Sequence, residues 1–381
     1  MDANVKETSK TRLAYLDNVR SLVIFLVIAM HTAVTYSGIG DWYYKEGSLE
    51  ALSMPEKVFF AFGQSFLQAW FMGILFFISA YWASKALAKR GPLNFIKERL
   101  FRLGIPLLIY VFIISPVIGY ILHDYIPEIG LAHNYVLYIT SFNWVGDTGP
   151  LWFVEALLIF CFVYALLKKL FPQSIKMNNA GSKKIIFAII LTGIMAFLIR
   201  LVFPIDTSFY NLQFCYFASY IVMFIAGILI GENDLLEKIA DVQNVKWIGI
   251  TLLIGVPIWV FIIICGGVLD DIYYFKGGLY WQSCAYALWE SLTAIGFSVG
   301  LIAAFRKKAN IANKWSDLLR NNAFAVYFFH APILVSISLV LRQLVLIPII
   351  KFAVVTIITF GICLVFSILV RKIKPVGMVL K

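Results

Sequence analysis

Residues 105–122 read IPLLIYVFIISPVIGYIL and residues 248–268 read IGITLLIGVPIWVFIIICGGV, and neither stretch contains a charged side chain. A helix of about 18 or more apolar residues is long enough to cross the ~30 Å hydrocarbon core of a bilayer. The same pattern extends outward along the whole chain, which is 61% hydrophobic and only 14% charged. Soluble domains carry about 25% charged residues, so the sequence predicts an all-α, polytopic integral membrane protein.

The apolar runs predict ten membrane-spanning helices in a single membrane domain that covers residues 1–381. A polar segment at 1–18 precedes them, a basic tail at 370–381 follows them, and the amphipathic stretch 135–145 is a candidate to lie on the membrane surface. The predicted spans are 19–37, 58–84, 103–122, 150–167, 185–203, 213–231, 247–265, 283–305, 322–341 and 345–369.

The basic residues set the expected orientation of these spans. Most of the 32 Lys and Arg side chains fall on alternate connections, with a dense group at 85–102, whereas the loop 38–57 is richer in acidic residues. Cytoplasmic loops carry the excess of Lys and Arg, so both termini are expected in the cytoplasm and loop 38–57 outside. The net charge of +11 therefore reflects topology, and no nucleic-acid partner is predicted. The five cysteines include no CxxC pair and are interpreted as core residues.

Ionisable residues inside the spans are costly and indicate functional sites. His31 is the first of them. At about 100° per residue it lies nearly above Arg20 on one helical stripe, with Asp17 close to the same stripe. This stripe is expected to face the interior of the bundle. A histidine suits proton abstraction because its pKa lies near neutrality; the alternative is a hydrogen-bonded structural histidine.

Further polar residues are expected inside later spans. Glu155 lies at a depth close to that of His31 and needs a partner, for which His31 and Arg200 are the candidates. Glu155 would either orient the histidine or form a structural ion pair. Glu290 is a similar intramembrane carboxylate. His330, two residues before a proline, indicates a local helix break and a buried polar point.

Two groups at the membrane surfaces complete the candidate site. Arg99 and Arg102 are expected on one helix face at the cytoplasmic end of the third span, where they suit a phosphate-bearing ligand or, alternatively, lipid headgroups. Trp42, Tyr43 and Tyr44 lie in the outer loop among carboxylates, which suits sugar stacking or an interfacial aromatic belt. No HExxH, GxSxG or phosphate-cradling glycine loop occurs, so no metal, tightly bound cofactor or serine-hydrolase chemistry is predicted.

Five segments carry a resemblance to a known family. They are YLDNVR at 15–20 with His31 after it, FFISA at 76–80, FIKERLFRLGIP at 95–106, GPLWFVE at 149–155 and AFAVYFFHAP at 323–332. Together they resemble the membrane acyltransferase 3 family, in the same order and spacing over nearly the whole chain. Within it, LDNVR, the DWYY at 41–44 and RLGIP look closest to the glucan biosynthesis protein C branch.

The resemblance implies an enzyme of a bacterial inner membrane that acylates a glycan outside the cytoplasm. The branch is associated with succinylation of periplasmic glucans, and related members acetylate other surface glycans. By this resemblance His31 is the catalytic base, and Arg99 and Arg102 hold the donor, expected to be acyl-CoA. Glu155 matches a glutamate in the motif that contains Trp152. The sequence is compatible with direct transfer of the acyl group and with an acyl-histidine intermediate. The alternative function is that of a glycan transporter or flippase. The sequence indicates no oligomeric state.

Overall fold

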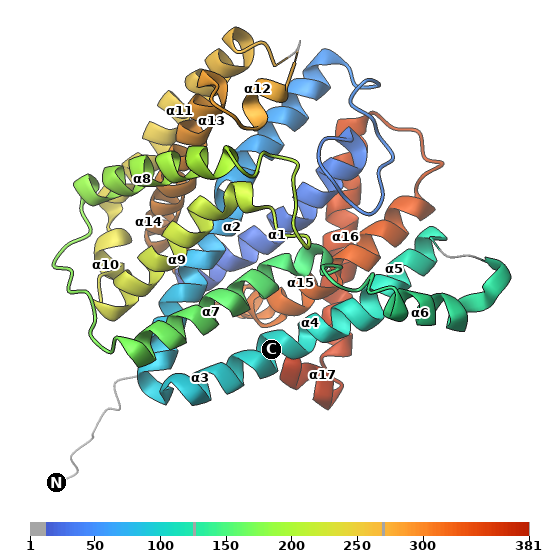
Figure 1. Ribbon diagram of the computed structural model, residues 1–381, viewed down its shortest axis with the longest axis horizontal. Coiled ribbons are helices and arrows are strands. Elements are labelled where there is room, and N and C mark those ends of the chain that lie inside the picture. Colours follow the sequence, from blue (N-terminus) through green and yellow to red (C-terminus); the bar gives the residue numbers. More distant parts are fainter. Residues whose placement is uncertain (1–12, 125–126, 269–270, 381) are drawn as a thin grey trace.

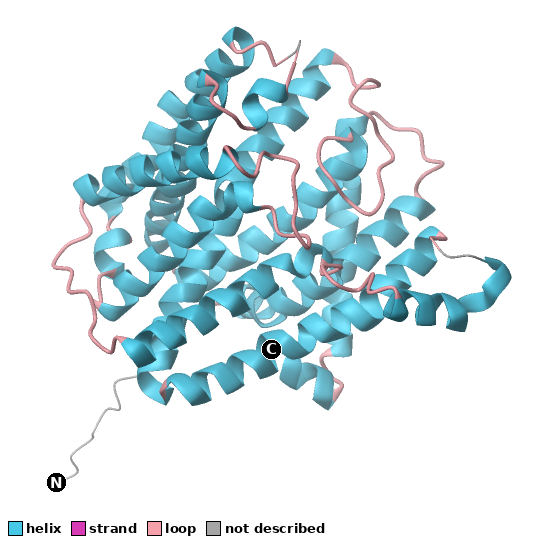
Figure 2. Cartoon of the chain, viewed as in Figure 1, coloured by secondary structure: helices cyan, strands magenta, loops and turns pink. Residues whose placement is uncertain are grey.

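The computed structural model describes residues 13–124, 127–268 and 271–380, so residues 1–12 of the expected N-terminal segment lie outside the described residues. Within these ranges the chain forms helices and no strand element, and ten helical segments are long and apolar enough to cross a membrane. Figure 2 shows helices joined by loops throughout. The predicted all-α, multi-pass architecture is confirmed. It suits lipid because a helix satisfies its backbone hydrogen bonds within one segment.

Four further helices are too short to be spanning segments. They are α6 (Gly130–Thr140), α10 (Leu236–Ile239), α12 (Tyr273–Lys276) and α17 (Lys374–Val379). The spanning segments are α1 (Ala14–Ser37), α2 (Met54–Arg90), Pro92–Leu122 with α3 to α5, Gly149–Leu170 with α7 (Trp152–Leu170), α8 (Ser182–Arg200), Phe214–Glu232 with α9 (Phe217–Glu232), Val242–Cys265 with α11 (Lys246–Cys265), Trp281–Lys308 with α13 (Trp281–Leu292) and α14 (Ser298–Lys308), α15 (Lys314–Val340) and α16 (Pro348–Val370).

The third segment differs most from its predicted bounds, because it begins at Pro92 and not at residue 103. It consists of α3 (Pro92–Arg99), a π-helical turn (Leu100–Gly104), α4 (Ile105–Ile109), a second π-helical turn (Tyr110–Ile114) and α5 (Ser115–Leu122). A proline follows closely after each π turn. Proline has no N–H and disturbs the regular α-helical ladder, and a wider turn accommodates it. The polar residues of α3 hid this helix from the hydropathy pattern.

Helix α1 lies at the centre of the candidate site and packs against α2, α15 and α16. Figure 1 shows α1 and α15 inside the bundle, with α16 beside them. Helices α1 and α15 run in the same direction. Their N-terminal turns meet where Arg20 approaches Arg320, and their later turns meet where His31 approaches His330. The fold therefore brings two histidines from opposite ends of the sequence together.

The loop 38–53 folds back over the C-terminal end of α1. Gly38, with φ of +70°, ends the helix in the left-handed conformation. The carbonyl of Thr35 then accepts hydrogen bonds from the N–H groups of Glu46 (2.8 Å) and Gly47 (3.0 Å). An ion pair between Lys351 of α16 and Glu46 fixes the loop from its other side. This loop and α3 lie at opposite ends of the bundle (Figure 1).

Candidate active site

Three aromatic rings stack at the centre of the candidate site. The imidazole of His31 stacks on the indole of Trp42, with ring centroids 3.8 Å apart, and the imidazole of His330 lies to the side, 5.2 Å from His31. The planes differ by 10° and 9° respectively. These rings come from α1, the loop 38–53 and α15. The structure thus brings together three of the residues singled out in the sequence, and we call them the ring stack.

The two histidines of the ring stack have different hydrogen-bonding states. Among the described residues, none makes a hydrogen bond to a ring nitrogen of His31, so its imidazole is available to a substrate. The predicted helix break after His330 is wrong, because α15 continues through Pro332 to Val340. The predicted burial is found: His330 is 0% exposed, and its Nδ1 lies 2.5 Å from the carbonyl oxygen of Tyr327. A carbonyl only accepts, so Nδ1 carries the proton and Nε2 is a bare acceptor. That Nε2 has no partner in the described part of the chain.

The loop tyrosines occupy different positions. The Tyr43 hydroxyl lies 3.3 Å from that of Tyr110, and burial raises the pKa of Tyr43 to about 12, so it stays protonated. Gly149, with φ of +46°, allows this approach, because a Cβ there would strike the Tyr43 hydroxyl. Asn211 holds Gly149 by donating to its carbonyl at 2.8 Å. Tyr44 is half-buried, and burial also raises its pKa.

Glu155 does not pair with either of its expected partners. Its carboxylate interacts with the hydroxyl of Thr148, and its Oε2 is buried with no hydrogen-bond partner among the residues described. Arg200 instead forms a buried ion pair with Glu290 between α8 and α13. Arg200, one of the two candidate partners of Glu155, is therefore paired with another carboxylate. Trp152 stacks on Tyr220 of α9 at 5.5 Å, away from the ring stack's three elements.

The two arginines of α3 and the π turn after it have different surroundings. The guanidinium of Arg99 lies over the Phe95 ring at 5.0 Å and near Cys161 of α7. Arg102 is exposed, and its Nε lies 3.2 Å from Glu98. The π turn that begins after Arg99 takes more residues per turn than an α-helix. The two guanidinium groups nevertheless remain close enough to interact with each other.

Asp17 and Arg20 form an ion pair of 3.3 Å at the opposite end of α1 from His31. The Arg20 side chain is 38% exposed, so it lies at the rim and not inside the bundle as expected. Ile24 and Val27, which separate it from His31 along the helix, are buried. The predicted stripe is therefore polar only at its two ends.

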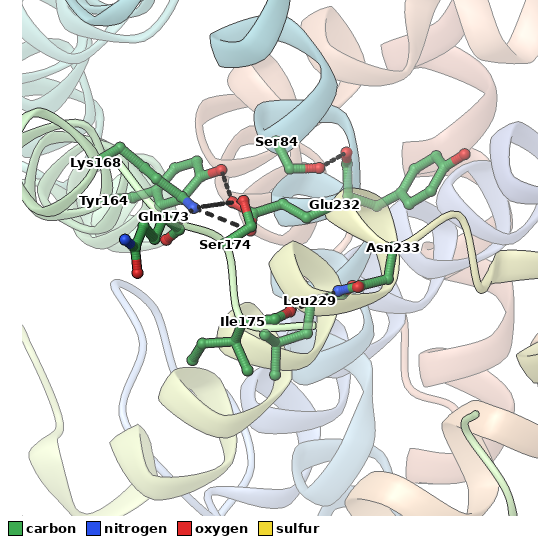
Figure 3. Close-up of polar contacts among 10 residues, drawn as sticks. Ser84, Tyr164, Lys168, Gln173, Ser174, Ile175, Leu229, Glu232 and Asn233 are labelled. Carbon is green, nitrogen blue, oxygen red and sulfur yellow. Dashed lines mark hydrogen bonds and ion pairs between the residues drawn. The ribbon is translucent and has the colours of Figure 1, made fainter. Parts of the chain in front are cut away.

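A polar hollow at the α3 end of the bundle was missed in the sequence. Glu232 accepts hydrogen bonds from Tyr164 (2.7 Å) and Lys168 (3.0 Å), and Lys168 also donates to Ser174 (Figure 3). The hollow has a volume of about 680 Å³ and is lined by Gln173, Ser174, Lys176, Asn178, Glu232 and Asn233. It lies where α7 and α9 end. The sequence offers one indication of this hollow, because the charged residues Lys168 and Glu232 directly follow two of the predicted spans.

A second missed group lies near the Tyr43–Tyr110 contact. Asp147 accepts hydrogen bonds from Ser115 (2.6 Å) and from Tyr138 of α6 (2.9 Å). Burial raises the pKa of Asp147 above its ordinary value, while these two bonds oppose that rise. The stretch predicted at 135–145 is helical only to Thr140, and α6 buries no side chain. Its tyrosines tie it to the third spanning segment.

Comparison with known families extends over almost the entire chain. Residues 13–368 match a family described as an acyltransferase domain, Acyl_transf_3. No curated protein and no solved structure shows a significant match. The matched range contains the ring stack, Glu155 and both arginines of the third segment. The chain therefore belongs to the acyltransferase 3 family and is a membrane enzyme that transfers acyl groups.

Proposed function

We propose that this enzyme moves an acyl group from acyl-CoA in the cytoplasm to a hydroxyl of a glycan outside a bacterial inner membrane. The observation that carries the proposal is the imidazole of His31, which is free of hydrogen bonds to the described residues and is stacked beneath Trp42. The loop that contributes Trp42 lies at the opposite end of the bundle from the helix that contributes Arg99 (Figure 1). Such an arrangement suits two substrates that approach from different sides.

In the proposed reaction His31 removes the proton from the acceptor hydroxyl. The oxygen attacks the thioester carbonyl carbon, the C–S bond breaks, and the acyl group forms an ester with the glycan. The thiolate leaves and takes the proton from His31, so the histidine returns to its neutral form. Glu155 contributes a buried carboxylate oxygen without a partner among the described residues, which suits a substrate hydrogen-bond donor.

The donor would bind at the α3 end of the bundle. Arg99 and Arg102 supply guanidinium groups for its phosphates. The polar hollow lies at the same end and offers hydrogen-bonding side chains such as Lys168 and Ser174. Arg20, at that end of α1, is eleven residues from His31, which is roughly 16 Å of helix rise. An extended pantetheine-type arm would cover this distance between the helices.

The acceptor would enter beside the loop 38–53, where Trp42, Tyr43 and Tyr44 offer rings and hydroxyls to a sugar. The resemblance to the glucan biosynthesis protein C branch supports a succinyl group, and related members support an acetyl group. Mass spectrometry of surface glycans from cells with and without the active protein tests the proposal. An acyl ester present only with the protein is expected. Identical glycans in both samples, together with altered glycan export, would instead favour a transporter.

A further inference from the structure

Two polar atoms of the ring stack are buried without hydrogen-bond partners among the described residues. They are Nε1 of Trp42 and Nε2 of His330. The centroids of these two rings lie 6.0 Å apart, with 17° between their planes. Buried polar atoms nearly always have a partner. A single orphaned indole Nε1, such as that of Trp259, occurs elsewhere in the described part of the chain. Here two orphaned atoms lie on neighbouring rings beside His31, and this pairing points to a ligand group that the folded chain does not itself supply.

The chemistry of the two atoms is complementary and fixed. An indole Nε1 can only donate a hydrogen bond. In the neutral imidazole of His330, Nε2 accepts one, because the Tyr327 carbonyl holds the single ring proton on Nδ1. The missing group must therefore accept from one ring and donate to the other.

We propose that a hydroxyl group of the acceptor binds between Trp42 and His330, beside the base His31. A hydroxyl has one O–H donor and two lone pairs, so a single hydroxyl satisfies both orphaned atoms. A thioester carbonyl or a carboxylate can only accept and would leave His330 unpaired. An ammonium group can only donate and would leave Trp42 unpaired. The inference rests on the proposed function, and it makes Trp42 and His330 hydroxyl-binding residues for a neutral, polyhydroxylated acceptor.

Variants of His330 separate hydroxyl binding from a structural role. In His330→Asn the amide can still donate to the Tyr327 carbonyl, but no acceptor remains at the position of Nε2. In His330→Gln the longer amide can place an oxygen near that position, while the bond to Tyr327 is lost. A structural histidine would tolerate Asn better than Gln. A hydroxyl-binding histidine would tolerate Gln better than Asn.

Trp42→Phe tests the other orphaned atom, since it keeps an aromatic ring and removes the N–H. Trp259→Phe is the matched control. Its Nε1 is also buried and unpaired within the described residues, but its ring packs against Phe62 at 5.1 Å, in a separate apolar cluster. Phenylalanine at 42 should weaken acceptor binding, and phenylalanine at 259 should not.

The experiment uses the full-length protein in detergent, with acyl-CoA as donor and the host's surface glycan, freed of esters by mild alkali, as acceptor. His330→Asn should raise the KM for glycan about tenfold, with His330→Gln less affected and acyl-CoA affinity unchanged in both. If the KM of His330→Asn for glycan equals that of the wild type, the inference is overturned. It is also overturned if His330→Asn changes only kcat. That second result is expected if the two atoms bind only water.

Folding and activity controls keep the outcomes distinct. If His330→Asn does not fold, the comparison of Trp42→Phe with Trp259→Phe decides, and equal glycan KM values for those two variants would overturn the inference. If the wild type transfers no acyl group to the glycan, the proposed function fails and takes the inference with it. An active wild type with an unaffected His330→Asn variant overturns only the inference.

Discussion

Helices α1 and α15 run in parallel and carry similar polar residues at similar spacing, yet their histidines differ. Each helix has an Asp three residues before an Arg, and a histidine ten or eleven residues after that Arg. The two sets are Asp17, Arg20 and His31 in α1, and Asp317, Arg320 and His330 in α15. The Asp and Arg of each helix form an ion pair, of 3.3 Å in α1 and 3.4 Å in α15.

The difference lies in what surrounds each histidine. The backbone of α15 holds Nδ1 of His330 and so fixes its tautomer. Among the described residues, His31 is held by ring contacts alone, with Trp42 stacked on its face and His330 beside it. A base must gain and lose a proton in each cycle, whereas a binding group needs one fixed state. Local hydrogen bonding, and not spacing along the helix, therefore separates the proposed base from the proposed hydroxyl-binding residue.

The largest effect is expected from His31→Ala. Loss of a general base reduces the rate by about 10²- to 10⁴-fold, while the fold is retained because no hydrogen bond from the described residues to the ring is lost. Initial rates of acyl transfer and the thermal midpoint in detergent measure the two properties. A folded variant with the wild-type rate would remove the distinction between the two helices.

Arg99→Ala should weaken acyl-CoA binding by roughly tenfold or more, because a charge-assisted hydrogen bond to phosphate is lost. Arg102→Ala should have a smaller effect, since Arg102 is exposed and already paired with Glu98. Titration with acyl-CoA in nanodiscs measures both affinities, with exposed Lys97→Ala as the control. If a variant with both Arg99→Ala and Arg102→Ala binds acyl-CoA with unchanged affinity, the donor binds elsewhere. Arg99→Lys would be a poor substitute if the contact is bidentate.

Lys351→Met tests the loop that brings Trp42 to His31. The Lys351 side chain is 5% exposed and pairs with Glu46, so its loss leaves a partly buried carboxylate unpaired and should cost about 1–3 kcal/mol. Lys45→Met is the control, because its pair with Asp41 is exposed and should contribute little. Chemical unfolding of the two variants gives the difference. Equal stabilities would show that the ion pair does not fix the loop.

The smallest effects are expected at the matching ends of the two helices. Arg20→Ala and Arg320→Ala each break a partly exposed i, i+3 ion pair, and such pairs contribute about 0.2–1 kcal/mol. Each variant should therefore unfold close to the wild type and retain acyl transfer. A loss of activity in Arg20→Ala alone would show that the two helices differ at this end as well.

Much of the fold could be predicted from the sequence, because lipid leaves few alternatives to an apolar helix. The ten spans follow from hydropathy alone. The start of the third segment at Pro92 could not be predicted, since α3 is polar on the surface and contacts α7 through only part of its face. The π turns before Pro106 and Pro116 depend on local backbone adjustments that hydrophobic periodicity does not encode.

The sequence identifies the individual residues of the candidate site, but it does not predict which of them contact one another. His31, Trp42 and His330 were each singled out by position, because an ionisable or aromatic side chain is conspicuous in an apolar chain. Their stacking depends on how loop 38–53 folds back, which no local pattern specifies. Arg200 shows the opposite outcome. It was only one of two candidate partners for Glu155 and pairs with Glu290 instead, since depth along a helix does not determine which neighbouring helix supplies the carboxylate.

In the proposed reaction, donor and acceptor reach His31 from opposite faces of the membrane, and cysteine accessibility measures this orientation. In a background without the five native cysteines, exposed Ser48 and Asn94 are replaced singly by cysteine. An impermeant thiol reagent is then applied to intact cells and to inverted vesicles. The account predicts that Ser48→Cys reacts only from outside and Asn94→Cys only from the cytoplasm. If both cysteines react from the same side, or if Ser48→Cys reacts only from the cytoplasm and Asn94→Cys only from outside, the proposed orientation is contradicted.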